Sequence, residues 1–214
     1  MNIPVSHGHL EAAHREPPGT LRGAGIVCHP HPLQGGTMHT KVVFRAAQAL
    51  ADAKIAALRF NFRGVGTSTG SYEMGVGEKG DVLAALDWLE EKYPGAPLVV
   101  GGFSFGSMVG LGAAAEDPRV VALFGLSLPV RMYDYGFLAN VRKPILVVQG
   151  DEDELGSGSD VEPIVAALGS HVTLARIAGA DHYFDGQIDE LKSVMSDYFG
   201  SGPGGRALSE GLIE

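Results

Sequence analysis

The residues best suited to chemistry lie in a pentapeptide that sets one serine between two glycines, Gly102-Phe103-Ser104-Phe105-Gly106. An apolar run, residues 98–101, precedes it, and a segment rich in small residues, 108–115, follows it. We therefore expect a strand, a sharp turn and a helix, which would expose the serine hydroxyl, while the glycines let strand and helix approach closely. An incidental serine in a glycine-rich turn is the alternative, and the flanking elements argue against it. The pattern indicates Ser104 as a nucleophile.

A serine hydroxyl is a weak nucleophile at neutral pH, so it needs a base, and the base needs a third group to orient it. Two later strand candidates lead into turns that carry such groups. Residues 145–149 run into an acidic turn with Asp151 and Asp153, and residues 172–177 run into a turn with His182. Because the carboxyl ends of parallel strands meet at one edge of a sheet, we expect these side chains to converge on the serine. The histidine would be the general base and one of the two aspartates the orienting carboxylate.

Short β-rich runs alternate with helical patterns along the chain. The expected strands are residues 26–28, 55–62, 98–103, 120–126, 145–149 and 172–177. The expected helices are residues 41–53, 80–92, 107–116, 160–168 and 188–199. This alternation predicts an α/β fold with a mostly parallel central sheet and helices on both faces. The residues before position 19 carry weaker signals for an antiparallel hairpin at one edge of the sheet.

The helix expected over residues 80–92 has an amphipathic pattern. At helical spacing, four apolar residues stand opposite five acidic ones, namely Val82, Leu83, Leu86 and Leu89 against Glu78, Asp81, Asp87, Glu90 and Glu91. We expect one apolar and one acidic face.

The chain length of 214 residues suits a single domain, which we place at residues 1–200. Residues 201–214 begin with a glycine- and proline-rich run and form a C-terminal tail for which we expect little order. Only residues 129–144 separate the fourth and fifth strand candidates. A large lid domain does not fit in that space.

Two further stretches, together with the serine pentapeptide, resemble the α/β-hydrolase superfamily: residues 28–38 (CHPHPLQGGTM) and residues 59–68 (RFNFRGVGTS). The chain is similar, over nearly its whole length, to the compact, lidless carboxylesterase and dienelactone-hydrolase-like group. The resemblance implies the α/β-hydrolase fold and a triad in the order serine, acid, histidine. Dienelactone hydrolases proper have a cysteine at the nucleophile position, where this chain has Ser104. That departure argues against a dienelactone as the substrate.

The resemblance also assigns the acid. The family pattern after the family's sixth strand, here the strand expected over residues 145–149, is G-x-x-D-x-hydrophobic, and it matches Gly150, Asp153 and Leu155. It therefore selects Asp153 as the triad carboxylate, with Asp151 as the alternative.

An acyl-transfer site of this kind needs two backbone N–H groups aimed at the developing negative charge. Phe105, directly after the nucleophile, should supply one. The resemblance points to Leu33, in the loop after the first parallel strand, for the other, and His31 is the alternative donor. The neighbouring prolines have no N–H and stiffen this loop.

A metal site is the main competing interpretation of the histidines, with His29, His31 and His39 as imaginable ligands beside the acidic residues 151–154. The spacing is not H-E-x-x-H, and the single cysteine, Cys28, cannot pair with another to complete a site. We expect neither a metal nor a cofactor. Cys28, at a strand end, is expected to pack as a small apolar residue.

Two other features are assigned no role in binding. Arg63 could bind an anionic group, but an arginine that ties loops together by hydrogen bonds is the favoured interpretation. The glycine-rich residues 64–70 lack the Lys-Ser/Thr ending of a phosphate loop and the G-x-G-x-x-G spacing of a dinucleotide site.

Composition narrows the partners. The formal net charge is −9 and no cluster of basic residues is present, so nucleic acid is not expected as a partner. Residues 1–19 lack the apolar core of a secretory signal, and the longest apolar stretches fall short of a membrane span. One cysteine agrees with a reducing compartment. We expect a cytoplasmic protein that acts on a small molecule.

These observations predict a serine hydrolase that cleaves a small carboxylic ester or related acyl bond through an acyl-enzyme intermediate. A thioesterase, peptidase or acyltransferase with the same triad stays open, as does a non-catalytic binding module on the same scaffold. The physiological substrate and the oligomeric state are also open.

Overall fold

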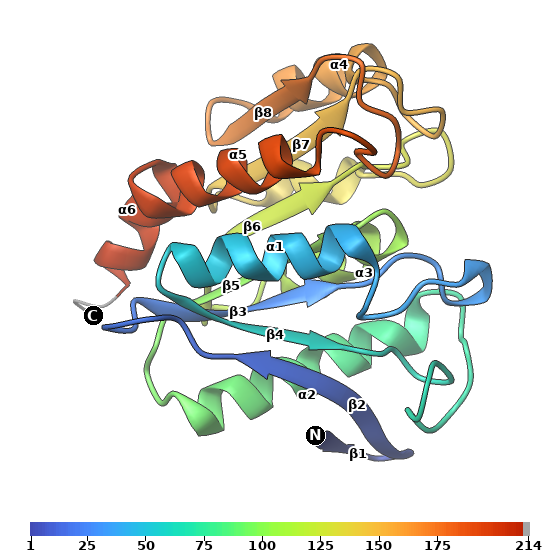
Figure 1. Cartoon of the computed structure of the whole chain (residues 1–214), viewed down its shortest axis with the longest axis vertical. Coiled ribbons are helices and arrows are strands. Elements are labelled where there is room, and N and C mark those ends of the chain that lie inside the picture. The colour runs from blue at the N-terminus through green and yellow to red at the C-terminus, as the bar shows by residue number, and fades with distance from the viewer. Residues whose placement is uncertain (212–214) are drawn as a thin grey trace.

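An eight-stranded sheet forms the centre of the structure, a computed structural model that describes residues 1–211 (Figure 1). Its strand order is β1-β2-β4-β3-β5-β6-β7-β8. Strands β3 to β8 pair in parallel, whereas β2 is antiparallel to β4 and β1 is antiparallel to β2. The strands are β1 (Asn2–Val5), β2 (Gly8–Arg15), β3 (Gly23–Cys28), β4 (Ile55–Phe60), β5 (Leu98–Phe103), β6 (Val120–Leu126), β7 (Ile145–Gly150) and β8 (Val172–Ile177). The expected parallel sheet with an antiparallel hairpin at one edge is confirmed.

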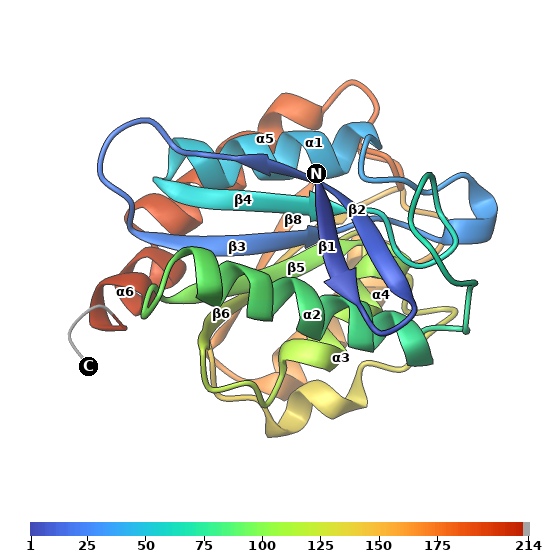
Figure 2. The same cartoon turned by 90° about the horizontal axis from the view of Figure 1, so that it is seen from below.

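Helices cover both faces of this sheet, as Figure 2 shows when the sheet is seen from its β1 side. One face carries α1 (Lys41–Asp52), α5 (Ile188–Gly200) and α6 (Pro203–Glu210). The other carries α2 (Val76–Lys92), α3 (Phe105–Ala114) and α4 (Gly158–Leu168). Two short 3-10 helices, η1 (Pro32–Gln34) and η2 (Gly136–Asn140), lie in connecting segments.

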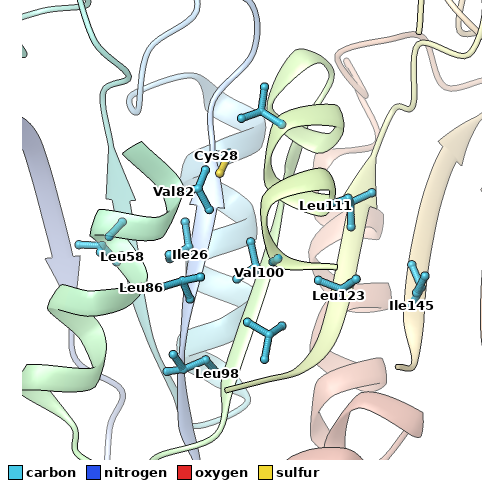
Figure 3. Packing of buried hydrophobic residues seen from close by; sticks show 14 of the residues in the cluster. Ile26, Cys28, Leu58, Val82, Leu86, Leu98, Val100, Leu111, Leu123 and Ile145 are labelled. Carbon is cyan, nitrogen blue, oxygen red and sulfur yellow. The ribbon is translucent and has the colours of Figure 1, made fainter. Parts of the chain in front are cut away.

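The core is split into two clusters by the alternation of side chains along each strand. In β3, Ile26 belongs to the cluster under α2 and α3, and Val27 belongs to the cluster under α1 and α5. Figure 3 shows the first cluster, in which Val82 and Leu86 of α2 approach Ile26. Every residue of β3, β4, β5 and β7 is buried, because helices cover both faces of these strands. A buried parallel sheet of this kind gives the strand ends fixed positions.

Helix α2 begins at Val76, four residues before the start that its sequence pattern predicts. The reason is Glu78, which is fully buried rather than part of an acidic surface. Its carboxylate accepts the backbone N–H groups of Glu73 (2.8 Å) and Gly75 (2.7 Å). These bonds satisfy donors at the start of the helix and fix the preceding loop.

The expected acidic face of α2 is also wrong at Asp81, which is fully buried. Its carboxylate accepts three hydrogen bonds of 2.8–3.1 Å from the Arg63 guanidinium and one of 2.9 Å from the Arg63 backbone. His7 Nε2 lies 3.1 Å from the same carboxylate. Conversely, Leu83 is 40% exposed. Arg63 thus ties loops together, as predicted from the sequence. Its ion-pair partner, Asp81, belongs to the face of α2 that was expected to be in contact with solvent.

The C-terminal segment differs from the expectation of little order over residues 201–214, because α6 forms within it. Arg22 donates to backbone oxygens at the end of α5 and to the backbone oxygen of Gly205 (2.8 Å). Leu208 is fully buried among residues of α5 and the sheet. Tertiary contacts with distant residues therefore order a helix that its composition disfavours. The end of the predicted tail, residues 212–214, lies outside the described residues.

The connection between β6 and β7, residues 127–144, contains only η2. It forms no lid domain, as expected. Within the described residues 1–211, no helix is both long and apolar enough to cross a membrane.

Candidate active site

The serine lies at a sharp turn between β5 and α3. Ser104 has φ 55° and ψ −125°, a conformation that residues with side chains rarely adopt. Its N–H donates to the backbone oxygen of Leu126 in the neighbouring strand (2.9 Å). A Cβ on Gly102 would lie 2.5 Å from the backbone of Gly106, so strand and helix meet closely enough to require glycine there. The expected strand-turn-helix geometry is present.

The structure brings together the three side chains that the sequence singled out. Ser104 Oγ lies 2.9 Å from His182 Nε2, and His182 Nδ1 lies 2.9 Å from each oxygen of Asp153. All three residues are buried, with 7%, 3% and 1% of their surface exposed, respectively. The network fits an imidazole that donates Nδ1–H to the carboxylate and accepts the serine proton at Nε2. This arrangement can transfer the serine proton to the imidazole as the oxygen attacks an electrophile.

The carboxylate of Asp153 is held in place by its own neighbours. Gln149 Nε2 donates to one oxygen (2.9 Å) and the Leu155 N–H donates to the other (2.9 Å). Gln149 is fully buried, and its own Oε1 accepts the Leu128 N–H (2.7 Å). Gln149 was not among the site residues predicted from the sequence. A polar residue that ends an otherwise apolar buried strand was the available signal.

The alternative acid, Asp151, is not part of this cluster. Its carboxylate accepts a hydrogen bond of 2.7 Å from Arg176 Nε of β8. Both aspartates follow β7, but only Asp153 reaches the imidazole.

The loop that carries His182 is fixed from several sides. Ser127 Oγ donates to the His182 backbone oxygen (2.8 Å). The imidazole lies 5.0 Å from the Phe103 ring and 5.4 Å from the Tyr183 ring, measured between centroids. Packing of this kind limits rotation of the imidazole away from the serine.

A cavity of about 290 Å³ opens beside the serine hydroxyl. Besides Ser104, it is lined by Pro30, His31, Gln34, Gly35, Gly36, Thr40, Glu154, Leu155, His182 and Tyr183. A cavity of this volume accommodates a small ligand group. Groups that donate to an oxyanion formed beside Ser104 must lie at the lining of this cavity.

Phe105, the first expected donor, is the first residue of α3, so its N–H has no acceptor within the helix. The second expected donor, Leu33, does not fit this part of the site. Leu33 is 72% exposed, and its N–H donates to His31 Nδ1 (3.2 Å) instead. The turn of η1 carries it away from the cavity, whereas His31 lines the cavity. Of the two candidate donors, His31 is therefore the one that lies at the cavity.

The His31 ring is held on both sides. Its Nδ1 accepts the Leu33 N–H, so its Nε2–H faces the Tyr72 hydroxyl at 3.1 Å. The ring also packs against Phe105, with centroids 5.1 Å apart. Burial lowers the pKa of His31 below its usual value, which keeps the ring neutral at pH 7. The loop next to the serine is therefore rigid.

His29 and Cys28 are buried in the fold and are not accessible to solvent. His29 is fully buried, with Nδ1 2.6 Å from the Pro30 oxygen and Nε2 accepting the Phe62 N–H (3.0 Å). Burial lowers the pKa of His29 to about 4. Cys28 is fully buried, and burial raises the pKa of its thiol. His39 is exposed. Among residues 1–211, no three histidine, cysteine, aspartate or glutamate side chains gather as metal ligands would.

A parallel sheet with a serine elbow after β5, a carboxylate after β7 and a histidine after β8 defines the α/β-hydrolase class of protein. Comparisons with known proteins agree. The family described as an alpha/beta hydrolase domain matches residues 33–194. The chain belongs to this family of the α/β-hydrolase superfamily.

Similar proteins come from several bacteria. An uncharacterized protein of Rickettsia prowazekii (strain Madrid E) is 37% identical over 200 residues, which cover 89% of this chain and 84% of that protein. The solved structure of an alpha-beta serine hydrolase homologue from Coxiella burnetii has a TM-score of 0.87 and 38% identity, covering 92% of this chain and 94% of that one. The crystal structure of a serine hydrolase without lid from Xanthomonas campestris has a TM-score of 0.86 and 35% identity, covering 93% of this chain and 92% of that one. This chain is therefore a homologue of lidless α/β serine hydrolases.

Proposed function

We propose that this protein is a serine hydrolase that cleaves a small carboxylic ester or a related acyl bond through an acyl-enzyme intermediate. The observation that carries the proposal is the unbroken chain of contacts of 2.9 Å from Ser104 Oγ through His182 to Asp153. Its position at the wall of a cavity gives a substrate carbonyl access to the hydroxyl.

In the first half of the reaction, Ser104 Oγ attacks the carbonyl carbon while His182 Nε2 takes the serine proton. Asp153 stabilises the imidazolium that forms. The backbone N–H groups of Phe105 and His31 donate to the oxyanion. His182 then protonates the leaving oxygen, and the C–O bond to the leaving group breaks to give an ester of Ser104.

In the second half, a water molecule enters after the leaving group has gone. His182 takes its proton as the oxygen attacks the acyl-enzyme carbonyl, and returns that proton to Ser104 Oγ when the tetrahedral intermediate collapses. The carboxylic acid is released and the triad returns to its starting state.

The test compares Ser104→Ala with Ser71→Ala, which alters an exposed serine, on a short-chain aryl ester. We expect the first variant to lose about ten-thousand-fold or more in kcat/KM and the second to match the parent protein. Labelling by a fluorophosphonate should likewise disappear only in Ser104→Ala. Hydrolysis retained by Ser104→Ala would refute the proposal, and an unlabelled parent protein would indicate a binding module.

The same triad serves thioesterases, peptidases and acyltransferases, so a panel with an ester, a thioester and an amide of one acyl group distinguishes these activities. We further propose a small-molecule substrate and a cytoplasmic location. The single cysteine is buried and forms no disulfide, which supports a reducing compartment.

A further inference from the structure

The cavity beside the serine has an uneven distribution of charge. Gln34, Thr40 and Tyr183 contribute neutral polar groups to its walls. Among the residues that the structure describes, Glu154 is the one acidic residue in the lining, and it directly follows the triad aspartate in sequence. The His31 ring, also in the lining, is kept neutral by burial. Within residues 1–211, the cavity lining thus contains one glutamate and no lysine or arginine.

The backbone around Glu154 is firmly held while its side chain is free. Arg131 donates to the Glu154 backbone oxygen (2.9 Å), and the Arg131 N–H donates to the Leu155 oxygen (3.2 Å). The next residues are tied to Asp153 through the N–H groups of Leu155 (2.9 Å) and Gly156 (3.2 Å). Within residues 1–211, the Glu154 carboxylate itself makes no hydrogen bond or ion pair. It is exposed, so it serves neither a cap nor a salt bridge in the fold.

The neighbouring cations do not offset this charge. Lys41, after the wall residue Thr40, pairs with Asp185 (3.4 Å). Arg131, which anchors the Glu154 backbone, directs its other nitrogen to Asp160 (2.8 Å). Both of these cations are paired with other carboxylates, and neither forms an ion pair with Glu154 within residues 1–211.

We propose that Glu154 selects the substrate by charge: the group that enters the cavity carries an ammonium or a neutral hydrogen-bond donor, and substrates with a carboxylate there are disfavoured. This inference rests on the proposed hydrolase function. The physical basis is the interaction between a carboxylate on a fixed backbone and a charge a few ångströms away, which attracts a cationic group and repels an anionic one.

The experiment uses aryl acetates that carry a meta trimethylammonium, tert-butyl or carboxylate group, and a second series with the same groups on the acyl part. Values of kcat/KM are measured for the parent protein, for Glu154→Gln and for Glu152→Gln. Glu152 lies in the same turn, is exposed and does not line the cavity, so its substitution changes the net charge equally. Ratios between variants cancel the intrinsic reactivity of each ester.

In the series whose substituent enters the cavity, we expect the parent protein to favour the cationic over the anionic ester by about tenfold beyond intrinsic reactivity. Glu154→Gln should reduce this preference to about a third or less, and Glu152→Gln should leave it unchanged. The preference should also shrink between about 20 mM and about 500 mM salt.

Two results would overturn the proposal: no charge preference in either series, or equal losses in both variants, which would assign the effect to the overall charge. Failure of the hydrolase function is a separate result. It would show as no Ser104-dependent turnover of the neutral tert-butyl ester, whereas failure of the charge selection leaves that turnover intact.

Discussion

Acid should destabilise this protein through His29, a buried histidine that supports the loop beside the active site. The native ring donates to the Pro30 oxygen and accepts the Phe62 N–H, which requires it to be neutral. Burial lowers its pKa from 6.5 to about 4. An unfolded chain would bind a proton at His29 near pH 6.5, whereas the native state resists protonation until about pH 4.

The sign and size of the change in the free energy of unfolding follow from the difference between these two pKa values. Above pH 6.5 both states are neutral and His29 confers no pH dependence. As the pH falls from 6.5 to about 4, the unfolded state gains a proton that the native state lacks, so the free energy of unfolding decreases. The lowering of about 2.5 pKa units corresponds to a loss of about 3 kcal/mol below pH 4, of which about 2 kcal/mol is already lost at pH 5.

Urea unfolding at pH 8, 6.5 and 5 measures this effect in the parent protein and in His29→Gln. Glutamine keeps a hydrogen-bonding side chain but does not titrate. The variant should be less stable than the parent at pH 8, since glutamine reproduces the hydrogen bonds of the ring only imperfectly. The difference in the free energy of unfolding between the two proteins should narrow by about 2 kcal/mol by pH 5. His39→Gln, a change at an exposed histidine of the same loop, is the control and should run parallel to the parent.

Parallel curves for the parent and His29→Gln between pH 6.5 and 5 would refute this reasoning. They would mean that His29 binds its proton equally well in the native and unfolded states.

Two further predictions concern the carboxylates after β7 and the C-terminal helix. Asp153→Asn should lower kcat for an aryl ester by about ten-thousand-fold, because the amide cannot hold the imidazole in the same tautomer. Asp151→Asn removes only a contact with Arg176, so its kcat should stay within about twofold of the parent value. Similar losses of kcat in both variants would contradict the geometry of the site. Arg22→Met should destabilise the protein by about 2 kcal/mol and speed amide hydrogen exchange in α6, since it removes the hydrogen bonds that dock this helix. Unchanged amide exchange in α6 would show that Leu208 alone orders the helix.

Much of the fold was predictable because its signals are local. The buried strands are short runs of apolar residues with breaks at glycine, proline and charge, and such runs specify a parallel sheet wherever they occur. The serine pentapeptide was informative for the same reason, since strand, turn and helix are all contained in about fifteen residues around Ser104. From the order of strands alone, the turns with Asp153 and His182 were expected at the same edge.

The sequence was less informative where several residues of the same type stand close together. Asp151 and Asp153 are two positions apart in one turn, and the residue pattern by itself left both open. Gln149 and the backbone of Leu155 hold the second aspartate toward the imidazole, while Arg176 of β8 engages the first. The choice between Leu33 and His31 also depended on the fold of one turn, because the Leu33 N–H donates to His31 Nδ1 while His31 lines the cavity.

The sequence by itself determined the class of fold and the residues able to do chemistry, because periodicity and turn composition act over a few neighbouring positions. Only the tertiary structure decided which polar groups are buried and which partners they meet. Asp81 belongs to the core because the Arg63 guanidinium compensates its burial, and Glu78 belongs there because its carboxylate accepts the N–H groups of Glu73 and Gly75 directly before the helix. For Asp81 the compensation depends on contacts with His7 and Arg63, and for Glu78 it depends on how the preceding loop folds back onto the helix. Helical periodicity encodes neither arrangement.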